Sequence, residues 1–254
     1  MIAGGGDLDA RIWERFVDLA GGPDARIVVI PTAGAEDTYS DDWSGLDGLR
    51  AAGARHLTVL HTRDREVANS IEFTEPLREA TGVWFPGGRQ WRLVDAYLNT
   101  LVHHELFYLL DRDGVVGGTS AGASIQASFL IRGDPETNQI LYSPEYDVGF
   151  GLLRQSAVDQ HLFARGREND LWELLDERPD LLGIGVDEGT ALVIRGDVAE
   201  VIGRGHTLIY DPQPKGNGGW EIREAVRLGS GDLFDLGLRQ TLRRAVVNEE
   251  SQGG

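Results

Sequence analysis

A serine between two glycines is the first feature of this sequence that suggests chemistry. Residues 118–122 are Gly-Thr-Ser-Ala-Gly, so Ser120 stands between an apolar run and small residues that suit a helix start. A catalytic serine needs such a sharp turn, because tiny residues two positions away on either side leave its hydroxyl accessible. The following helix would supply its positive end and a free backbone N–H. The turn lacks the lysine of a P-loop and the third glycine of a dinucleotide site, so we predict that Ser120 is a nucleophile.

A serine nucleophile needs a general base, and the sequence offers six histidines. His161 stands in the stretch AVDQHLFARGR, at the end of a short apolar run and among Asp, Gln and two Arg. Such surroundings are typical of a site residue, so we predict that His161 is the base. The other histidines flank an early strand, lie in a helical stretch or stand in the turn GRGHTLI: His56, His61, His103, His104 and His206.

The base in turn needs an acid that orients its ring. The stretch GIGVDEGTALVI holds Asp187 and Glu188 between two apolar strand halves, where a carboxylate is costly unless it has a partner. Because side chains alternate along a strand, only one of the two can point into a site. The local chemistry favours the combination of Ser120, His161 and Glu188.

A second arrangement stays open, because α/β-hydrolases carry their triad in the chain order Ser, acid, His. In that order His206 would be the base for Ser120, and Asp187 or Asp197 would be the acid. This alternative predicts an esterase-like enzyme that turns over simple esters.

The elements that would position these residues are those of a parallel sheet. Short apolar runs are typical of buried parallel strands, and the sequence has four, three of which end at or near Gly or Pro: residues 25–34, 56–62, 82–88 and 113–120. Between them lie helix-like stretches, the last long enough for two helices: residues 9–21, 41–53 and 89–112. This alternation predicts an α/β sheet with helices on both faces. Ligands bind at the carboxyl ends of such strands, where Gly87, Gly88 and Ser120 would lie.

The second half of the chain differs in composition from the first. We predict a long polar loop at residues 132–153 and a helix at residues 168–178. Residues 181–211 are rich in Val and Ile and contain Gly-bearing turns, which predicts a C-terminal β-meander. Without a repeat or a Pro-rich linker, we expect a single catalytic domain over residues 1–254, frayed from about residue 247 to residue 254.

Composition excludes several classes of function. The formal net charge is −17, so nucleic acid is not an expected partner, since phosphate binding requires a basic face. There is no cysteine and no histidine spacing that suits a metal, so we expect no metal or cofactor. No apolar run has transmembrane length, so no membrane is expected. We expect a cytoplasmic protein; a secreted parent is the alternative, because residues 1–6 suggest a truncated first strand.

Four spaced motifs together resemble a known family. The stretches GGTSAGAS, VDQHLFARGR, GIGVDEGTALVI and FPGGRQWRLV are similar to those of the cyanophycinase family of serine peptidases, related more distantly to aspartyl dipeptidase. The opening AGGG and the late LGSGDLFDL fit as well, so the resemblance spans residues 3 to about 236. It implies a flavodoxin-like α/β fold similar to class I glutamine amidotransferases, with serine in place of cysteine. It also implies a homodimer, since family members are often dimers.

The resemblance further implies roles for single residues. Ser120 matches the nucleophile, His161 the base and Glu188 the third triad member. The backbone donors of an oxyanion hole match Gly88 and Ala121. Positions that line the substrate site match Gln90, Asp159, Gln160, Arg165 and Arg167. Arginines bind carboxylates bidentately, and a carboxylate would take a substrate ammonium or guanidinium group. Family members release β-Asp-Arg dipeptides from cyanophycin, a polyaspartate with arginine on each side chain.

Two positions depart from the family's pattern. The family commonly has an acid where this chain has Arg89, and an arginine where it has Asp170. Both are charge reversals close to the implied substrate pocket, so the substrate could be another β-aspartyl or acidic peptide instead of cyanophycin. A third hypothesis is that the fold serves as a binding module without catalysis.

Overall fold

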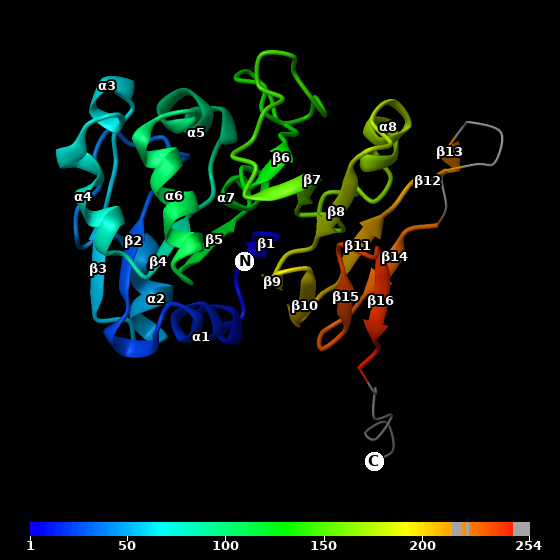
Figure 1. The fold of residues 1–254 in the computed structure, drawn as a ribbon, viewed down its shortest axis with the longest axis horizontal. Helices are drawn as coiled ribbons and strands as arrows, with labels where there is room; N and C mark the ends of the chain where they lie inside the picture. The colour runs from blue at the N-terminus through cyan, green and yellow to red at the C-terminus, as the bar shows by residue number, and fades with distance from the viewer. Residues whose placement is uncertain (215–219, 222–223, 246–254) are drawn as a thin grey trace.

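The larger sheet of the molecule combines parallel and antiparallel strands. The computed structural model describes residues 1–214, 220–221 and 224–245 (Figure 1). In spatial order the strands of this sheet are β16 (Gln240–Arg243), β15 (Leu233–Asp235), β10 (Val198–Gly203), β9 (Thr190–Arg195), β1 (Ile2–Ala3), β5 (Val115–Thr119), β4 (Gly82–Phe85), β2 (Arg26–Val29) and β3 (His56–Val59). The pairs from β1 to β3 are parallel and the remainder antiparallel. The predicted α/β architecture is confirmed.

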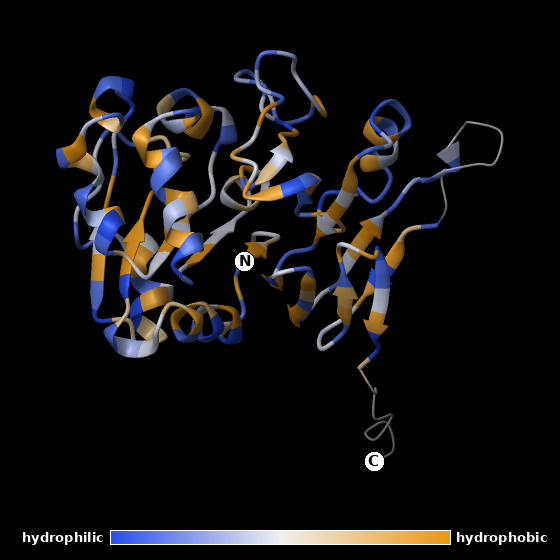
Figure 2. Ribbon diagram, viewed as in Figure 1, coloured by the Kyte–Doolittle hydropathy of each residue, from blue (hydrophilic) through white to orange (hydrophobic). Residues whose placement is uncertain are grey.

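The parallel strands β1, β2, β4 and β5 are largely buried on both faces, whereas the residues of the edge strand β3 are exposed or half-buried. On β4, Val83 and Phe85 pack into one apolar cluster, and Trp84 packs into another. Figure 2 shows β2 in the hydrophobic colour between helices that carry both colours. The apolar runs of the sequence are therefore these strands, and their carboxyl ends meet at one edge of the sheet.

Helices cover both faces of the parallel strands. One face is covered by α1 (Ala10–Leu19), η2 (Ser44–Leu46) and α2 (Asp47–Ala51), and the other by α3 (Arg65–Ala68), α4 (Ile71–Glu79), α5 (Gln90–Tyr97) and α6 (Leu101–Asp111). The short η1 (Gly22–Asp24) follows α1 and contains no buried residue. The side chain of Asp9 caps α1, and that of Ser70 caps α4, by accepting from backbone N–H groups. The helix predicted at residues 41–53 is reduced to η2 and α2. Residues 89–112 form two helices, as predicted, and Asn99 separates them with a φ of 60°.

A second, smaller sheet contains much of the second half of the chain. Its strands, in spatial order, are β14 (Val226–Leu228), β11 (Thr207–Tyr210), β8 (Leu182–Val186), β7 (Leu153–Gln160) and β6 (Ala127–Phe129). The short helix α7 (Ala121–Ser124) leads from β5 to β6, and α8 (Asp170–Glu177) is the helix predicted at 168–178. The short strands β12 (Gln213–Pro214) and β13 (Trp220–Glu221) pair with each other. In Figure 1 the predicted long loop, which joins β6 to β7, lies between α5 and α8.

The strands predicted over residues 181–211 are present, but they do not form a simple meander. β8 pairs with β7 and β11 in the smaller sheet, whereas β9 pairs with β1 and β10 in the larger one. The chain therefore crosses from one sheet to the other at residues 187–189. It makes a second crossing at Ser120, between β5 and β6. The predicted triad residues thus lie where the two sheets meet.

The first strand of the larger sheet is short, since β1 contains only Ile2 and Ala3. The tail predicted to fray at residues 247–254 lies outside the described residues. Among the helices that the structure describes, none is both long enough and apolar enough to cross a membrane.

Candidate active site

Ser120 occupies a sharp bend between β5 and α7, with φ 55° and ψ −117°. Its backbone N–H donates to Ala3 O at 3.0 Å, which fixes the bend to β1. The flanking glycines are required sterically. A β-carbon on Gly118 would lie 2.3 Å from Gly122 O, and one on Gly122 would lie 2.0 Å from Phe85 O. This strained turn presents the serine hydroxyl at the carboxyl end of β5, as a nucleophile elbow does.

His161 is the histidine that the structure brings to Ser120. Its Nε2 lies 2.9 Å from Ser120 Oγ, although 41 positions separate the two residues in the sequence. His161 directly follows β7 with a φ of 54°, and its backbone N–H donates to Gly4 O at 2.8 Å. The residue is only 7% exposed. A neutral imidazole in this position can accept the hydroxyl proton.

Glu188 is the carboxylate that faces the base. Its Oε1 lies 2.5 Å from His161 Nδ1. The neighbouring Asp187 points away, and its Oδ1 accepts from the backbone N–H groups of Phe163 at 3.0 Å and Ala164 at 3.3 Å. Only one of the two carboxylates therefore points into the site, as expected. Glu188 contacts the imidazole, and Asp187 binds the backbone of the segment that follows His161.

The surroundings of His161 lower its pKa below the ordinary value. Burial is the largest cause, because the charged imidazolium loses hydration. The hydrogen bond to Glu188 raises this pKa, and the positive charges of Arg165 and Arg167 lower it. The net shift is downward, so the ring is neutral at neutral pH. Glu188 accepts the Nδ1 proton, which leaves Nε2 free to accept one from Ser120.

His206, the alternative base, contacts an arginine. Its Nδ1 is 3.2 Å from Arg227 Nη2. It lines a separate hollow of about 620 Å³ together with Arg227. Asp197, one of the alternative acids, lies in the turn between β9 and β10. Asp187, the other alternative acid, does lie beside His206, since its backbone N–H donates to His206 O at 3.1 Å. The contact of Ser120 Oγ, however, is with His161, so the structure does not join the nucleophile to the alternative base.

Of the two predicted oxyanion donors, one is the residue after the nucleophile and the other follows a residue that lies against it. Ala121 directly follows Ser120 at the start of α7. On the loop after β4, a β-carbon on Gly87 would lie 3.2 Å from Ser120 Cβ, and Gly88 has a φ of 146°. Within the described residues, neither the N–H of Gly88 nor that of Ala121 donates a hydrogen bond. Both are therefore free to stabilise a developing oxyanion.

The glycines at positions 4–6 belong to the same site, which the residue types alone did not indicate. A β-carbon on Gly5 would lie 2.3 Å from His161 Cε1, and one on Gly6 would lie 2.5 Å from Glu188 Oε2. Gly5 O accepts from the backbone N–H of Gly189 at 3.0 Å. Both glycines also have positive φ, 104° and 66°. Three consecutive glycines after a short apolar run were the available signal, and close backbone approach is their physical reason.

Comparison with known families places this site in context. The model of peptidase family S51 matches residues 1–202. The chain belongs to peptidase family S51. It is 34% identical over 208 residues to a cyanophycinase of Geminocystis herdmanii, covering 80% of this chain and 75% of that protein. It is also 34% identical over 268 aligned positions to a cyanophycinase of Synechococcus elongatus, covering 97% and 82%. The predicted resemblance is confirmed, and the chain is a peptidase.

Solved structures agree on the fold. The crystal structure of a peptidase from an acI-B1 actinobacterium matches with a TM-score of 0.69 at 23% identity, over 92% of this chain and 95% of that one. A putative peptidase E from Listeria monocytogenes matches with a TM-score of 0.56 at 18% identity, over 79% and 95%. At these identities the likeness shows the shared α/β fold alone.

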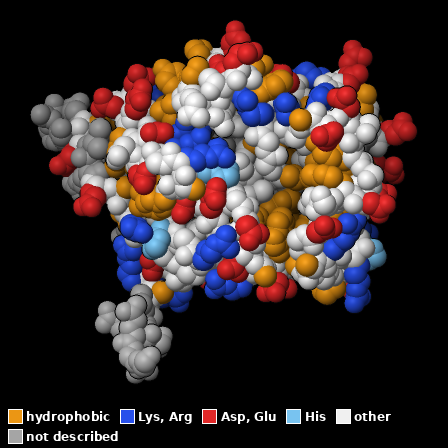
Figure 3. Space-filling view, turned by 180° about the vertical axis from the view of Figure 1, so that it is seen from behind, with side chains coloured by type: hydrophobic (Ala, Val, Ile, Leu, Met, Phe, Trp, Pro, Cys, Tyr) orange, Lys and Arg blue, Asp and Glu red, His pale blue; other side chains and the backbone are white. Residues whose placement is uncertain are grey.

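The residues expected to line the substrate site of this S51 peptidase differ in accessibility. Arg165 is exposed, whereas Gln90 is 2% exposed and its Nε2 donates to Ile131 O at 2.9 Å. Gln160 is 4% exposed, and its Oε1 is buried without a hydrogen-bond partner among the described residues. Figure 3 shows basic side chains next to a histidine near the middle of one face. Arg165 is therefore the predicted cation best placed to meet a ligand.

Asp159 does not fit the predicted contact with a substrate cation. It is fully buried, at 0% exposure, and both carboxylate oxygens are occupied. Arg132 Nε donates to Oδ1 at 2.9 Å and Arg132 Nη2 to Oδ2 at 2.8 Å. Arg167 Nη1 lies 3.5 Å from Oδ1. Burial lowers the pKa of Arg167 to about 10, and Asp159 opposes that shift. The acid thus binds arginines of its own chain, which the sequence could not show because Arg132 lies 27 residues away.

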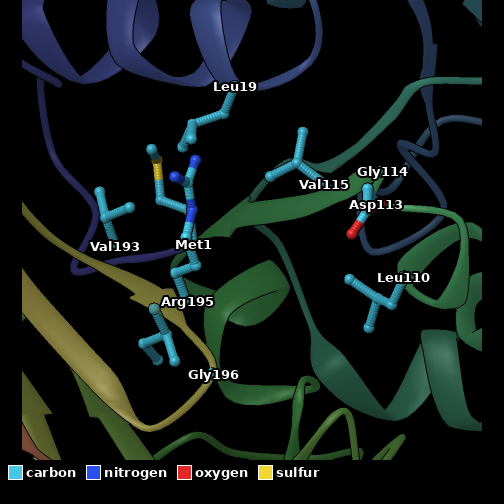
Figure 4. A pocket seen from close by; sticks show the side chains of 10 residues that line it. Met1, Leu19, Leu110, Asp113, Gly114, Val115, Val193, Arg195 and Gly196 are labelled. Carbon is cyan, nitrogen blue, oxygen red and sulfur yellow. The ribbon is translucent and has the colours of Figure 1, made fainter.

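A pocket of this S51 peptidase lies away from the triad. It has a volume of about 570 Å³, and its wall includes Val115, at the opposite end of β5 from Ser120. Figure 4 shows Met1, Leu19 and Val193 around this hollow. It contains none of the predicted site residues. Across the described part of the chain, no group of three or more His, Asp or Glu is arranged to hold a metal ion.

Proposed function

We propose that this S51 peptidase cleaves its substrate through a Ser120–His161–Glu188 triad and an acyl-enzyme intermediate. One observation carries the proposal: a continuous chain of contacts from Ser120 Oγ to His161 Nε2 at 2.9 Å, and from His161 Nδ1 to Glu188 Oε1 at 2.5 Å. The strained φ of 55° at Ser120 supports it, because strain of this kind persists where the surrounding structure maintains it for function.

The proposed reaction proceeds in two halves. Ser120 Oγ attacks the scissile carbonyl carbon while His161 Nε2 takes the hydroxyl proton. The N–H groups of Gly88 and Ala121 stabilise the oxyanion, a contribution of about 3 kcal/mol for each donor. The imidazolium, stabilised by Glu188, then protonates the leaving amine as the C–N bond breaks. Water, deprotonated by the same imidazole, hydrolyses the acyl-enzyme and restores the serine hydroxyl.

The proposed substrate is cyanophycin or a related β-aspartyl or acidic peptide. The cyanophycinase relatives, at 34% identity over most of the chain, support this class. The exposed Arg165, next to the base, supplies a cation for a substrate carboxylate. Because Arg89 and Asp170 depart from the family's pattern, the first experiment should test a panel of substrates instead of cyanophycin alone.

The test is incubation of the purified protein with cyanophycin and with α- and β-aspartyl dipeptides, followed by mass spectrometry. The matched control is Ser120→Ala. Release of β-Asp-Arg that is lost in the control would establish cyanophycin as the substrate. Ser120-dependent turnover of another peptide alone would mean that the charge reversals have changed the specificity. No turnover of any substrate would favour the non-catalytic hypothesis.

A further inference from the structure

Arg132 is a buried arginine that no step of the proposed reaction uses. It lies near the start of the loop after β6, is 2% exposed, and adopts a φ of 55°. Besides its two hydrogen bonds to Asp159, its Nη2 donates to Asp170 Oδ2 at 2.6 Å. Burying a guanidinium carries a large desolvation penalty, and a positive φ is unfavourable for a residue as bulky as arginine. Two unfavourable features at one residue suggest a role beyond stability.

One end of this ion cluster fixes the peptide groups next to the base. Asp159 Oδ1 accepts from the Gln160 backbone N–H at 2.9 Å. Arg167 Nη1 donates to Gln160 O at 3.1 Å. The peptide groups on either side of Gln160 are therefore held by Asp159 and Arg167, and Arg132 in turn binds Asp159. His161 is the next residue, and it has a positive φ of 54°. This unfavourable backbone conformation must be maintained by the contacts around it.

The other end of the cluster reaches the loop of the predicted oxyanion donor. Ile131 O accepts from Gln90 Nε2 at 2.9 Å, and Asp134 O accepts from Arg89 Nη2 at 2.6 Å. Arg89 and Gln90 directly follow Gly88. Figure 1 shows the loop that contains this segment between α5, which begins at Gln90, and α8. Residues 131–134 thus connect the oxyanion loop to the turn that carries the base.

We propose that Arg132 is a positioning residue for the reaction of Ser120. Through Asp159 and residues 131–134, it fixes the position of the His161 turn relative to the Gly88 loop. This inference rests on the proposed function, because it assigns Arg132 to the same site. Arg132 does not bind substrate, since it is buried. A displacement of about 1 Å in an active site reduces the reaction rate by about 100-fold. A residue that fixes the base relative to the oxyanion loop therefore affects the rate.

Asp170 has a supporting part in this arrangement. Its carboxylate is 40% exposed, so its contact with Arg132 is weaker than the buried, bidentate contact from Asp159. The acid at position 170, where the family commonly has an arginine, therefore binds a cation of its own chain. This accounts for one of the two charge reversals without any change in the triad.

The experiment compares Arg132→Lys and Arg132→Met with the wild-type protein. Three quantities are measured: the rate of Ser120 labelling by a fluorophosphonate, kcat and KM on a cleaved peptide, and the melting temperature. Lysine keeps the charge but cannot bind two carboxylates in a fixed fork. We expect labelling and kcat to fall by about 10- to 100-fold in both variants, with KM within about threefold.

The matched control is Arg78→Lys, which perturbs an ion pair outside the site. Arg78 Nε lies 3.1 Å from the Oε1 of Glu105, a buried carboxylate, and the pair joins α4 to α6. We expect this variant to retain wild-type labelling and kcat. Should the Arg132 variants fail to fold, Asp170→Asn keeps the contacts of Asp159 and is expected to slow labelling by about threefold to tenfold.

One readout does not depend on activity. The proton between His161 Nδ1 and Glu188 Oε1 should give a downfield proton NMR signal, assigned by its absence in Glu188→Gln. We expect Arg132→Lys to shift or broaden this signal, even if the wild-type protein cleaves none of the substrates and the proposed function fails. An unchanged signal, wild-type kcat at a lowered melting temperature, or a raised KM with unchanged kcat would each overturn the positioning role.

Discussion

Gly5 lies directly against the imidazole of His161, so closely that a β-carbon there would be 2.3 Å from Cε1 and 2.6 Å from Nε2. The backbone of Gly4 accepts a hydrogen bond from the N–H of the same histidine at 2.8 Å. The backbone of Gly4 and Gly5 therefore packs directly against the proposed base. This relation makes Gly5 a probe of His161 that leaves the histidine itself unchanged.

We expect Gly5→Ala to lower kcat/KM by about 100-fold, because the new methyl group displaces the imidazole. The matched control is Gly21→Ala. Gly21 also has positive φ, 114°, but a β-carbon there would meet nothing within 4 Å. Both variants should lose about 1 kcal/mol of stability from backbone strain. Steady-state kinetics and thermal unfolding separate the two effects; equal activities of the two variants would argue against the close packing.

The two histidine hypotheses make opposite predictions. We expect His161→Ala to reduce kcat/KM by at least about 1,000-fold, because Ser120 loses its base. His206→Ala should stay within about threefold of the wild type, since the imidazole of His206 contacts Arg227 instead of the serine. Kinetics on the same peptide and on a simple aryl ester decide between them. The reverse pattern would restore the esterase-like alternative.

Glu188 should affect both the rate and its pH dependence. The reaction needs neutral His161, so kcat/KM rises with pH through the pKa of that ring, which burial shifts below its usual value of 6.5. Glu188 raises this pKa, so Glu188→Gln should move the acid limb to still lower pH. The rate should also fall by at least about 100-fold, because the ring loses its orienting acid.

Asp187→Asn provides the matched control for that profile. Asp187 is adjacent to Glu188, and its Oδ1 accepts only backbone N–H groups, which an asparagine oxygen can also bind. We expect its pH profile to overlay that of the wild type. A shift of the acid limb in Asp187→Asn, with none in Glu188→Gln, would mean that the two carboxylates have exchanged roles.

Much of the fold could be predicted because its strands are strongly apolar. The runs that contain β2, β4 and β5 end at or near Gly or Pro, and burial of these strands on both faces requires apolar runs. The division of residues 181–211 between two sheets could not be predicted. Local alternation gives strands, but β9 finds its partner in β1, almost 190 residues earlier in the chain. Pairing over such a separation leaves no local pattern.

The candidate site shows the same limit. Ser120, His161 and Glu188 could be proposed from residue types, because each stands in a stretch where its chemistry is unexpected. The placement of Asp159 could not, since its burial depends on Arg132 from a distant loop. For the contact of Gly5 with His161, the only signal in the sequence is the run of three glycines, because a glycine carries no chemical group that indicates a site.

The most direct test of the central claim is the role of Ser120 as nucleophile. Wild-type protein and Ser120→Ala are incubated with the peptide that the wild type cleaves, and a fluorophosphonate adduct is mapped by peptide mass spectrometry. We predict a single adduct on Ser120, and at least about a 1,000-fold lower kcat/KM for Ser120→Ala with an unchanged melting temperature. Wild-type cleavage by folded Ser120→Ala, or an adduct that maps to another residue, would contradict the account.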